Sequence, residues 1–245
     1  MANYTLTFRE KKNVADGTDM FIFDKPADFV FEAGQYVVLR LANLVTPDTR
    51  AGVRSFSISS APCEEHVAFT MRRGDSGFKQ TMYALQAGET IGATGPVGHF
   101  TLAHASDELP IVFLVGGIGI TPVRSILKQA EHDKVERQFT AFYSNRFAKD
   151  SAFHEELKGL DLPNLRYVTT LSQEVLPCAE GNEERGYICE TMVRKYVPDV
   201  LGVWYYLVGA PAFIEAMEKM LSEMGVAKER QVCDPFAGLT GAPKK

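Results

Sequence analysis

The chain has 245 residues, and its 26 lysines and arginines against 31 aspartates and glutamates give a formal net charge of −5. A broad positive surface for nucleic acid or for an acidic membrane is therefore not expected. Hydrophobic residues make up 45% and charged residues 23% of the chain, which is typical of a folded globular protein with one large or two medium domains.

The longest apolar run, residues 111–115 continuing to 118, is far shorter than the ~18 residues of a membrane-spanning helix. Because the chain also opens on the polar stretch Met1-Ala2-Asn3-Tyr4, we expect a cytoplasmic protein. Its four cysteines contain no C-x-x-C pair and its five histidines show no metal-ligand spacing. We therefore expect reduced thiols and no bound metal.

Short strands are predicted along the first hundred residues, at 4–8, 19–23, 36–41, 55–59, 67–72 and 89–93. Turn signals rich in glycine, proline and aspartate separate them. Only residues 78–85 resemble a helix in this part. The pattern predicts a small antiparallel barrel with one helix over its mouth.

From residue 110 onward, buried strands alternate with helices. The predicted strands are 111–115, 139–143, 165–170 and 203–208, and the last two predicted helices are 190–196 and 211–224, the second ending at Gly225. Such alternation is typical of a parallel sheet in an α/β domain. We therefore predict two domains, residues 1–104 and 105–245.

A glycine-rich turn, Val115-Gly116-Gly117-Ile118-Gly119-Ile120-Thr121-Pro122, follows the first of these buried strands and opens a helix. Its backbone N–H groups could approach a phosphate closely, with Thr121 as N-cap and Pro122 at the first helical position. It is neither a P-loop nor a full G-x-G-x-x-G fingerprint. The turn indicates a pyrophosphate site, and a tight strand-to-helix turn without a ligand is the alternative.

In the barrel half, the segment Arg54-Ser55-Phe56-Ser57-Ile58-Ser59-Ser60 combines an arginine, an aromatic ring and hydroxyl groups. If the strand is extended, Arg54, Phe56 and Ile58 lie on one side. A phosphate donor beside a stacking face suits a flavin nucleotide, although Phe56 alone is typical of a core aromatic. The segment Gly77-Phe78-Lys79-Gln80-Thr81 could begin a helix that takes another phosphate.

Taken in order, these motifs with Gly95-Pro96-x-Gly98-x-Phe100, Tyr143-Ser144-Asn145-Arg146 and Gly209-Ala210-Pro211 resemble the ferredoxin–NADP⁺ reductase superfamily over nearly the whole chain. The resemblance implies an N-terminal FAD-binding barrel, residues 1–104, and a C-terminal NAD(P)-binding α/β domain, residues 105–245. It also implies an enzyme that moves a hydride between NAD(P)H and FAD.

The resemblance further assigns roles to single residues. In the barrel, Arg54 would hold the FAD phosphates, Phe56 would stack on the isoalloxazine, and Ser57, the one catalytic candidate, would orient flavin N5, while Gly77 and Thr81 complete the pyrophosphate site. In the second domain, the expected ligands of NADP(H) or NAD(H) are Gly117, Gly119, Thr121 and Pro122 at the phosphates, Gly209 and Pro211 at the nicotinamide, and Asn145 and Arg146 at the adenosine ribose. A guanidinium at Arg146 favours NADPH, and an arginine on a solvated loop is the alternative.

Three positions depart from the family pattern: Phe56 stands where tyrosine is usual, Val208 where cysteine is frequent, and Leu239 where an aromatic often follows an acidic-x-Phe ending, here Asp234-Pro235-Phe236. The close cysteines of a [2Fe–2S] domain are absent, so the resemblance implies a separate one-electron carrier, ferredoxin or flavodoxin, which could dock at Arg72, Arg73 and Lys79. The alternatives are an NADH-dependent oxygenase reductase, a flavin or quinone reductase, an electron-wiring subunit, and a binding module without turnover.

Overall fold

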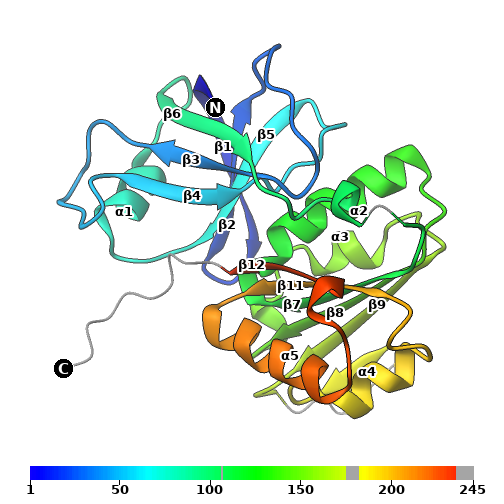
Figure 1. Cartoon of the computed structure of the whole chain (residues 1–245). Helices are drawn as coiled ribbons and strands as arrows, with labels where there is room; N and C mark the ends of the chain where they lie inside the picture. The colour runs from blue at the N-terminus through cyan, green and yellow to red at the C-terminus, as the bar shows by residue number, and fades with distance from the viewer. Residues whose placement is uncertain (106, 175–181, 236–245) are drawn as a thin grey trace. The chain divides into compact units, whose positions relative to one another are not determined.

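The computed structural model describes residues 1–105, 107–174 and 182–235, and the chain divides into two compact units (Figure 1). Unit 1 comprises Met1–Leu102 and Thr121–His132, and unit 2 comprises Ala103–Ile120 and the chain from Asp133 onward. Helix α2 (Ile120–Asp133) therefore groups with unit 1, although it lies within the stretch predicted as the second domain.

Unit 1 contains a six-stranded antiparallel sheet in the order β4-β3-β6-β1-β2-β5. Its elements are β1 (Ala2–Ala15), β2 (Thr18–Asp24), β3 (Tyr36–Arg40), β4 (Val53–Ser57), β5 (His66–Arg72), α1 (Gly77–Ala84), β6 (Thr90–Val97) and the 3₁₀ turn η1 (Leu102–His104). Just beyond β4, the Ser59 N–H donates to the Ala68 carbonyl of β5 at 2.8 Å, which brings the two edges of the sheet together. The predicted antiparallel barrel is confirmed.

Aromatic side chains fill the centre of unit 1. Phe21 and Phe23 of β2 and Phe69 of β5 are completely buried, and α1 adds Phe78 and Met82 to the same cluster. Burying one such side chain stabilises a fold by about 1.5–3 kcal/mol. The single helix predicted in this half is therefore held by its own apolar residues against the sheet.

Helix α2 is attached to unit 1 through polar groups that are almost fully buried. The Arg124 guanidinium donates to the Ser59 carbonyl at 2.6 Å and to both carboxylate oxygens of Glu64, at 2.9 and 3.1 Å. The next residue, Ser125, donates a hydrogen bond from its hydroxyl to the Ser60 carbonyl at 2.7 Å. These bonds explain why α2 groups with the strands rather than with unit 2.

Unit 2 contains a six-stranded parallel sheet in the order β10-β9-β8-β7-β11-β12. Its strands are β7 (Ile111–Gly116), β8 (Phe139–Asn145), β9 (Leu165–Leu171), β10 (Glu183–Arg185), β11 (Trp204–Gly209) and β12 (Gln231–Pro235). Its helices are α3 (His154–Lys158), α4 (Glu190–Tyr196) and α5 (Pro211–Glu223), with 3₁₀ turns η2 (Gly117–Gly119), η3 (Ala148–Asp150) and η4 (Lys228–Arg230). The predicted parallel sheet is confirmed, while the edge strands β10 and β12 were not predicted because they are short and lack an apolar run.

Helices α4 and α5 cover one face of this sheet (Figure 1). Val193 of α4 and Leu221 of α5 are fully buried in one cluster with Leu114 of β7 and Leu207 of β11. Gly225 ends α5 with a φ of +84°, as its position in the sequence predicts.

The order of the parallel strands creates a switch point beside β7. After β7 the chain adds β8, β9 and β10 on one side, and then returns to place β11 on the other. In open α/β sheets, ligands bind outside the carboxyl ends of the strands at such a point. The turn after β7 is therefore the first place to look for a site in unit 2.

Two local predictions are corrected by the structure. The strand expected at residues 55–59 is β4, which ends at Ser57, so the predicted alternation of sides does not extend to Ile58 and Ser59, which are both buried. Thr121 is not the N-cap of α2, because η2 makes the glycine turn helical and α2 begins at Ile120. Across the described residues, no helix is both long enough and apolar enough to cross a membrane.

Candidate functional site

The glycine turn after β7 lies in close contact with the end of β11. A Cβ on Gly119 would stand 2.7 Å from the Val208 carbonyl oxygen, and one on Gly209 would stand 3.2 Å from the Gly116 carbonyl oxygen. Gly117 has a φ of +55° and Gly209 a φ of +154°, both of which favour glycine. The glycines at this edge are therefore required by backbone packing, whether or not a ligand also uses the space.

The predicted residues Pro211 and Asn145 of unit 2 lie at the same edge. Pro211 is the first residue of α5, two positions after β11 ends at Gly209. Thr121 and Pro122 belong to unit 1 and are buried in the first turn of α2. Gly116 and Ser144 are partners in the ladder between β7 and β8, which places Asn145 one residue further along the neighbouring strand end. The structure thus brings the turn, the end of β8 and the start of α5 together at one edge of the parallel sheet.

Asn145 carries the clearest sign of a missing partner. Its side chain is 5% exposed, and within the described parts of the chain neither its amide nitrogen nor its carbonyl oxygen has a hydrogen-bond partner. Buried polar atoms without partners are rare and costly, because they lose water and gain nothing. A polar ligand at the switch point, such as the ribose of a dinucleotide, would supply the missing bonds.

Arg146 follows Asn145 and is exposed. No ion pair joins its guanidinium to another residue in the described ranges, while its backbone carbonyl accepts from the Gln173 N–H at 3.0 Å. A fixed backbone with a solvated guanidinium fits a role in pairing with a phosphate group.

In unit 1, Arg54, Phe56 and Phe78 form one cluster. The ring of Phe56 stacks on that of Phe78, with centroids 5.4 Å apart and planes 20° apart, and the Arg54 guanidinium lies over the Phe78 ring at 5.5 Å. Phe56 is partly buried against the core. One face of Phe56 is therefore already covered by a residue of the chain itself.

The Arg54 guanidinium also binds the carboxylate of Asp48. Its Nη2 lies 2.7 Å from Oδ1 of Asp48, whose side chain is 1% exposed. The same oxygen accepts a hydrogen bond from the Phe78 backbone N–H in the first turn of α1, at 3.4 Å. Arg54 and α1 thus jointly hold an anionic group, which is the property that a nucleotide phosphate requires.

Gly77 and Thr81 are in contact with the segment that carries Asp48. A Cβ on Gly77 would stand 2.2 Å from the Thr46 carbonyl oxygen. The Thr81 hydroxyl accepts from the Val45 N–H at 2.9 Å and donates to the Gly77 carbonyl at 2.7 Å. Both predicted phosphate ligands are therefore beside Arg54, but their groups already bind the chain.

Ser57, the catalytic candidate, is 7% exposed at the last position of β4. Of the basic residues predicted for docking, Arg72 and Arg73 are exposed and Lys79 is half-buried. Burial, followed by the charges of Arg72 and Arg54, lowers the pKa of Lys79. Asp234 lies in β12, whereas Phe236 is outside the described residues.

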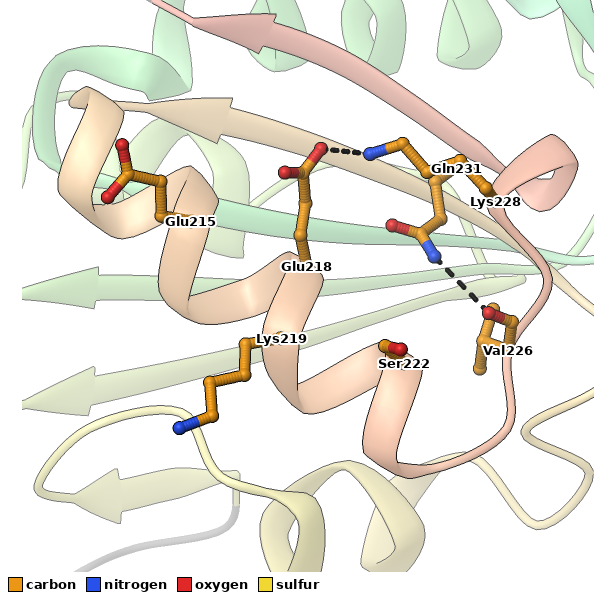
Figure 2. Close-up of a pocket in the computed structure, with 7 residues that line it drawn as sticks. All are labelled: Glu215, Glu218, Lys219, Ser222, Val226, Lys228 and Gln231. Atoms are coloured by element: carbon orange, nitrogen blue, oxygen red, sulfur yellow. Dashed lines mark hydrogen bonds and ion pairs between the residues drawn. The ribbon is translucent and has the colours of Figure 1, made fainter.

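A separate depression lies on the outer side of α5 and contains none of the predicted residues (Figure 2). Charged and polar side chains line it, among them Glu218, which pairs with Lys228, and Gln231, which donates to the Val226 carbonyl. Gln231 begins β12, so this depression is at the amino end of a strand and not at the ligand-binding edge of the sheet.

Cys233 of β12 contacts Glu218. Burial and then Glu218 raise the pKa of the Cys233 thiol to about 12, so it is not a reactive thiolate.

Two polar residues at the sites escaped the sequence analysis. Asp48 stands in a Pro-Asp turn six residues before Arg54, a spacing that contains no sign of the pairing. Glu64 pairs with Arg124 across 60 positions of the chain. The sequence shows that Asp48 is close to the Arg54 motif, but it does not show that the two side chains form an ion pair.

Comparison with known proteins agrees with this geometry. The family model of the oxidoreductase NAD-binding domain matches residues 113–219, which include the glycine turn, Asn145 and the start of α5. The chain is 33% identical over 203 residues to ferredoxin–NADP reductase B of Sorangium cellulosum, covering 79% of this chain and 77% of that protein. It is 29% identical over 219 residues to the reductase component of propane 2-monooxygenase from Rhodococcus jostii, covering 86% of this chain and 57% of that protein.

Among solved structures, the Amycolatopsis cytochrome P450 reductase GcoB superposes with a TM-score of 0.79 and 25% identity, covering 96% of this chain and 70% of that one. The chain spans little more than half the length of several curated relatives, between 50% and 57%. The similarity to the Sorangium protein covers most of both chains, and the barrel, the parallel sheet and the glycine turn accompany it. The chain belongs to the ferredoxin–NADP⁺ reductase superfamily, the FAD- and NAD(P)-binding oxidoreductases.

Proposed function

We propose that the chain is an NAD(P)H-dependent flavin reductase that holds FAD on unit 1, binds the nicotinamide nucleotide on unit 2 and passes electrons to a separate carrier protein. The observation that carries the proposal is Asn145. Its buried amide, which has no hydrogen-bond partner among the described residues, lies at the switch point beside the glycine turn, where a dinucleotide of this family would need a polar contact.

Each unit has its own part in the proposal. In unit 2, the N–H groups of the turn from Gly117 to Gly119 hold the pyrophosphate, while Gly209 and Pro211 border the nicotinamide. Thr121 and Pro122, in the first turn of α2, are the further residues that we propose for the pyrophosphate. In unit 1, Arg54, Gly77 and Thr81 lie beside the FAD phosphates, and Phe56 offers its free face to the flavin ring.

The flavin supplies the redox chemistry, since it accepts a hydride from reduced nicotinamide and releases electrons one at a time. The protein needs no acid or base for this step, and its task is to hold the reacting atoms at van der Waals distance. Ser57, fixed by burial at the end of β4, is the group that orients flavin N5.

Ferredoxin or flavodoxin is the carrier that we propose, with Arg72 and Lys79 as part of its docking surface because such carriers are acidic. An oxygenase component is the second candidate for the acceptor. The 29% identity to a propane monooxygenase reductase component and the superposition on a cytochrome P450 reductase support it. The proposal includes a cytoplasmic location, where NAD(P)H is supplied and thiols stay reduced.

The test is an anaerobic titration of the purified chain, supplemented with FAD, with NADPH and then with NADH. We expect a flavin spectrum that one of the two nucleotides bleaches within seconds. Oxidised ferredoxin, flavodoxin and cytochrome are then added in turn to find which restores the oxidised spectrum. A chain that binds no FAD, or whose bound FAD neither nucleotide reduces, contradicts the proposal.

Arg146 provides a prediction about nucleotide choice. If its guanidinium pairs with a 2′-phosphate, Arg146→Leu will raise the KM for NADPH about tenfold and leave that for NADH unchanged. Steady-state kinetics with both nucleotides measure this. Arg40→Leu, which removes an exposed arginine from β3, is the control. An unchanged ratio of the two KM values would remove Arg146 from the site.

A further inference from the structure

Asp48 occupies the place in unit 1 where an anion would be expected to bind. Its carboxylate accepts hydrogen bonds from the Arg54 guanidinium at 2.7 Å, from the Arg50 and Gly52 N–H groups at 3.1 Å each, and from the Phe78 N–H at 3.4 Å. Burial alone would raise the pKa of this carboxyl, but these four donors outweigh it and hold the pKa below its ordinary value. Asp48 is therefore ionised in the folded chain at neutral pH.

The rest of the segment that carries Asp48 lies on the first turn of α1. Besides the contacts of Val45 and Thr46 with Thr81 and Gly77, the Thr46 hydroxyl donates to Oε1 of Gln80 at 3.0 Å. Every N-terminal group of α1 that the family resemblance assigns to a phosphate is therefore next to this segment. A phosphate that bound the Phe78 N–H and the Nη2 group of Arg54 would compete with the Asp48 carboxylate for both donors.

The turn that presents Asp48 is strained. Ala51 has a φ of +48°, in the left-handed region that residues other than glycine rarely adopt. The Ala51 N–H donates to the Asp48 carbonyl, and the Gly52 N–H to the Asp48 carboxylate, both at 3.1 Å. Since the side chain of Asp48 closes this turn, releasing the carboxylate from its donors would also let Ala51 relax.

Positively charged side chains lie beside the Asp48 site. Burial and then the charges of Arg72 and Arg54 lower the pKa of the half-buried Lys79, and the charge of Asp75 raises it. Within the described residues no ion pair is formed by Arg72 or Lys79. Removing the carboxylate from Arg54 would leave three cations of unit 1 near one another. An incoming phosphate would then replace the charge that Asp48 provides.

We propose that Asp48 is a built-in competitor for the flavin phosphate at Arg54, displaced when a phosphorylated flavin binds, and that it thereby limits the preference of unit 1 for FMN and FAD over riboflavin. The inference rests on the proposed function, because it assumes that unit 1 binds a flavin. Its consequence is a flavin held mainly through the ring and ribityl chain, with little net affinity gained from the phosphates. A ligand contact that must first break an internal ion pair gains only the difference between the two.

The test compares three flavins on the full-length chain after its flavin has been removed by dialysis. Asp48→Asn removes the charge and keeps an oxygen that can accept from Arg54. We expect the dissociation constants of FMN and FAD to fall about tenfold in this variant, while that of riboflavin changes less than about twofold. Quenching of flavin fluorescence measures all three constants.

Two further variants define the result. Asp19→Asn is the matched control, because Asp19 is also a buried carboxylate of unit 1 and pairs with a different arginine, Arg73, at 3.5 Å. It should change none of the three constants. Arg54→Met should weaken FMN and FAD and spare riboflavin, which identifies Arg54 as the partner of the phosphate.

A measurement on the unaltered chain covers the case in which Asp48→Asn does not fold. Binding of FMN should speed hydrogen exchange at the Gly52 amide, which Asp48 then no longer holds, and riboflavin should not. Two results would contradict the proposal that Asp48 competes with the flavin phosphate: FMN binds equally or less well to Asp48→Asn, or FMN slows hydrogen exchange at the Gly52 amide of the unaltered chain. In either case Asp48 instead positions Arg54. If the chain binds none of the three flavins, the proposed function fails and this inference fails with it.

Discussion

At the scale of single residues, the two serines Ser55 and Ser57 have different surroundings on one short strand. Ser55 is exposed in the middle of β4, whereas Ser57 is 7% exposed at its end. A hydroxyl that is fixed by its surroundings can orient a bound ring, because little rotational freedom remains to be lost. Ser57 therefore suits the role at flavin N5 better than a solvated strand residue would.

Ser57→Ala should lower the rate of flavin reduction by NAD(P)H by about tenfold to a hundredfold, with little loss of bound FAD. Rapid-mixing absorbance under anaerobic conditions measures the rate, and the flavin content of the purified variant measures retention. Ser55→Ala is the control on the same strand and should behave like the unaltered chain. An unchanged reduction rate in Ser57→Ala would contradict the assignment.

The anion that Arg54 contacts in the structure could not be identified from the sequence. The motif around Arg54 predicts a phosphate partner from residue types alone, and its contact with an anion at α1 agrees with that chemistry. That the anion is Asp48 depends on how residues 41–52 fold back, which no local pattern specifies. That Arg54 binds the FAD phosphates therefore stays a prediction, and FAD would have to compete with Asp48 for this arginine.

At the scale of elements, the glycine turn between β7 and α2 shows how packing and binding share residues. Gly119 approaches the backbone of Val208, so its lack of a side chain is required by the neighbouring strand. The motif in the sequence predicts the turn and its place before a helix correctly. It places the helix start too late because η2 is itself helical.

Gly119→Ala should destabilise unit 2 by about 1–3 kcal/mol, because its Cβ would stand 2.7 Å from a main-chain oxygen that cannot move without shifting β11. Thermal denaturation measures the loss. Gly92→Ala in β6 is the control, since a Cβ there would meet its nearest atom at an ordinary 3.5 Å. Equal melting temperatures for the two variants would show that the turn accommodates the added methyl group without loss of stability.

At the scale of the whole molecule, the two units are not continuous in sequence. Unit 1 takes Thr121–His132 from beyond the first strand of unit 2. The pairing of Arg124 with Glu64, and of Ser125 with the Ser60 carbonyl, accounts for this grouping. The pairing of Arg124 with Glu64 also makes the stability of unit 1 depend on pH, because Glu64 titrates.

Burial would raise the pKa of Glu64, but the hydrogen bond and charge of Arg124 hold it below its ordinary value of 4.5. A carboxylate with a lowered pKa in the folded state stabilises the fold above its unfolded pKa, and this stability is lost as the pH falls through the folded value. We therefore expect the free energy of unfolding of unit 1 to decrease steeply below about pH 4.5.

Glu64→Gln should flatten that decrease and lower the free energy of unfolding at pH 7 by about 2 kcal/mol, because Arg124 keeps a neutral partner only. Hydrogen exchange of the β5 amides between pH 3 and 7 measures both effects. Glu184→Gln, which removes the partner of the exposed Lys195 in unit 2, is the control and should leave the β5 amides unchanged. A pH profile of Glu64→Gln identical to that of the unaltered chain would exclude Glu64 as the titrating group.

Residue periodicity and turn residues act locally, so the sequence was enough to predict a short-stranded antiparallel half, a parallel half from residue 110, and a glycine turn at the start of α2. It also determined the family, through six ordered motifs. Three facts appear only in the folded chain: Asp48 pairs with Arg54, Arg124 binds Ser59 and Glu64 of unit 1, and Asn145 is buried without a partner among the described residues. These facts depend on contacts between residues that are brought together by folding. The residues next to a carboxylate or an amide in the sequence do not indicate which distant group it will bind.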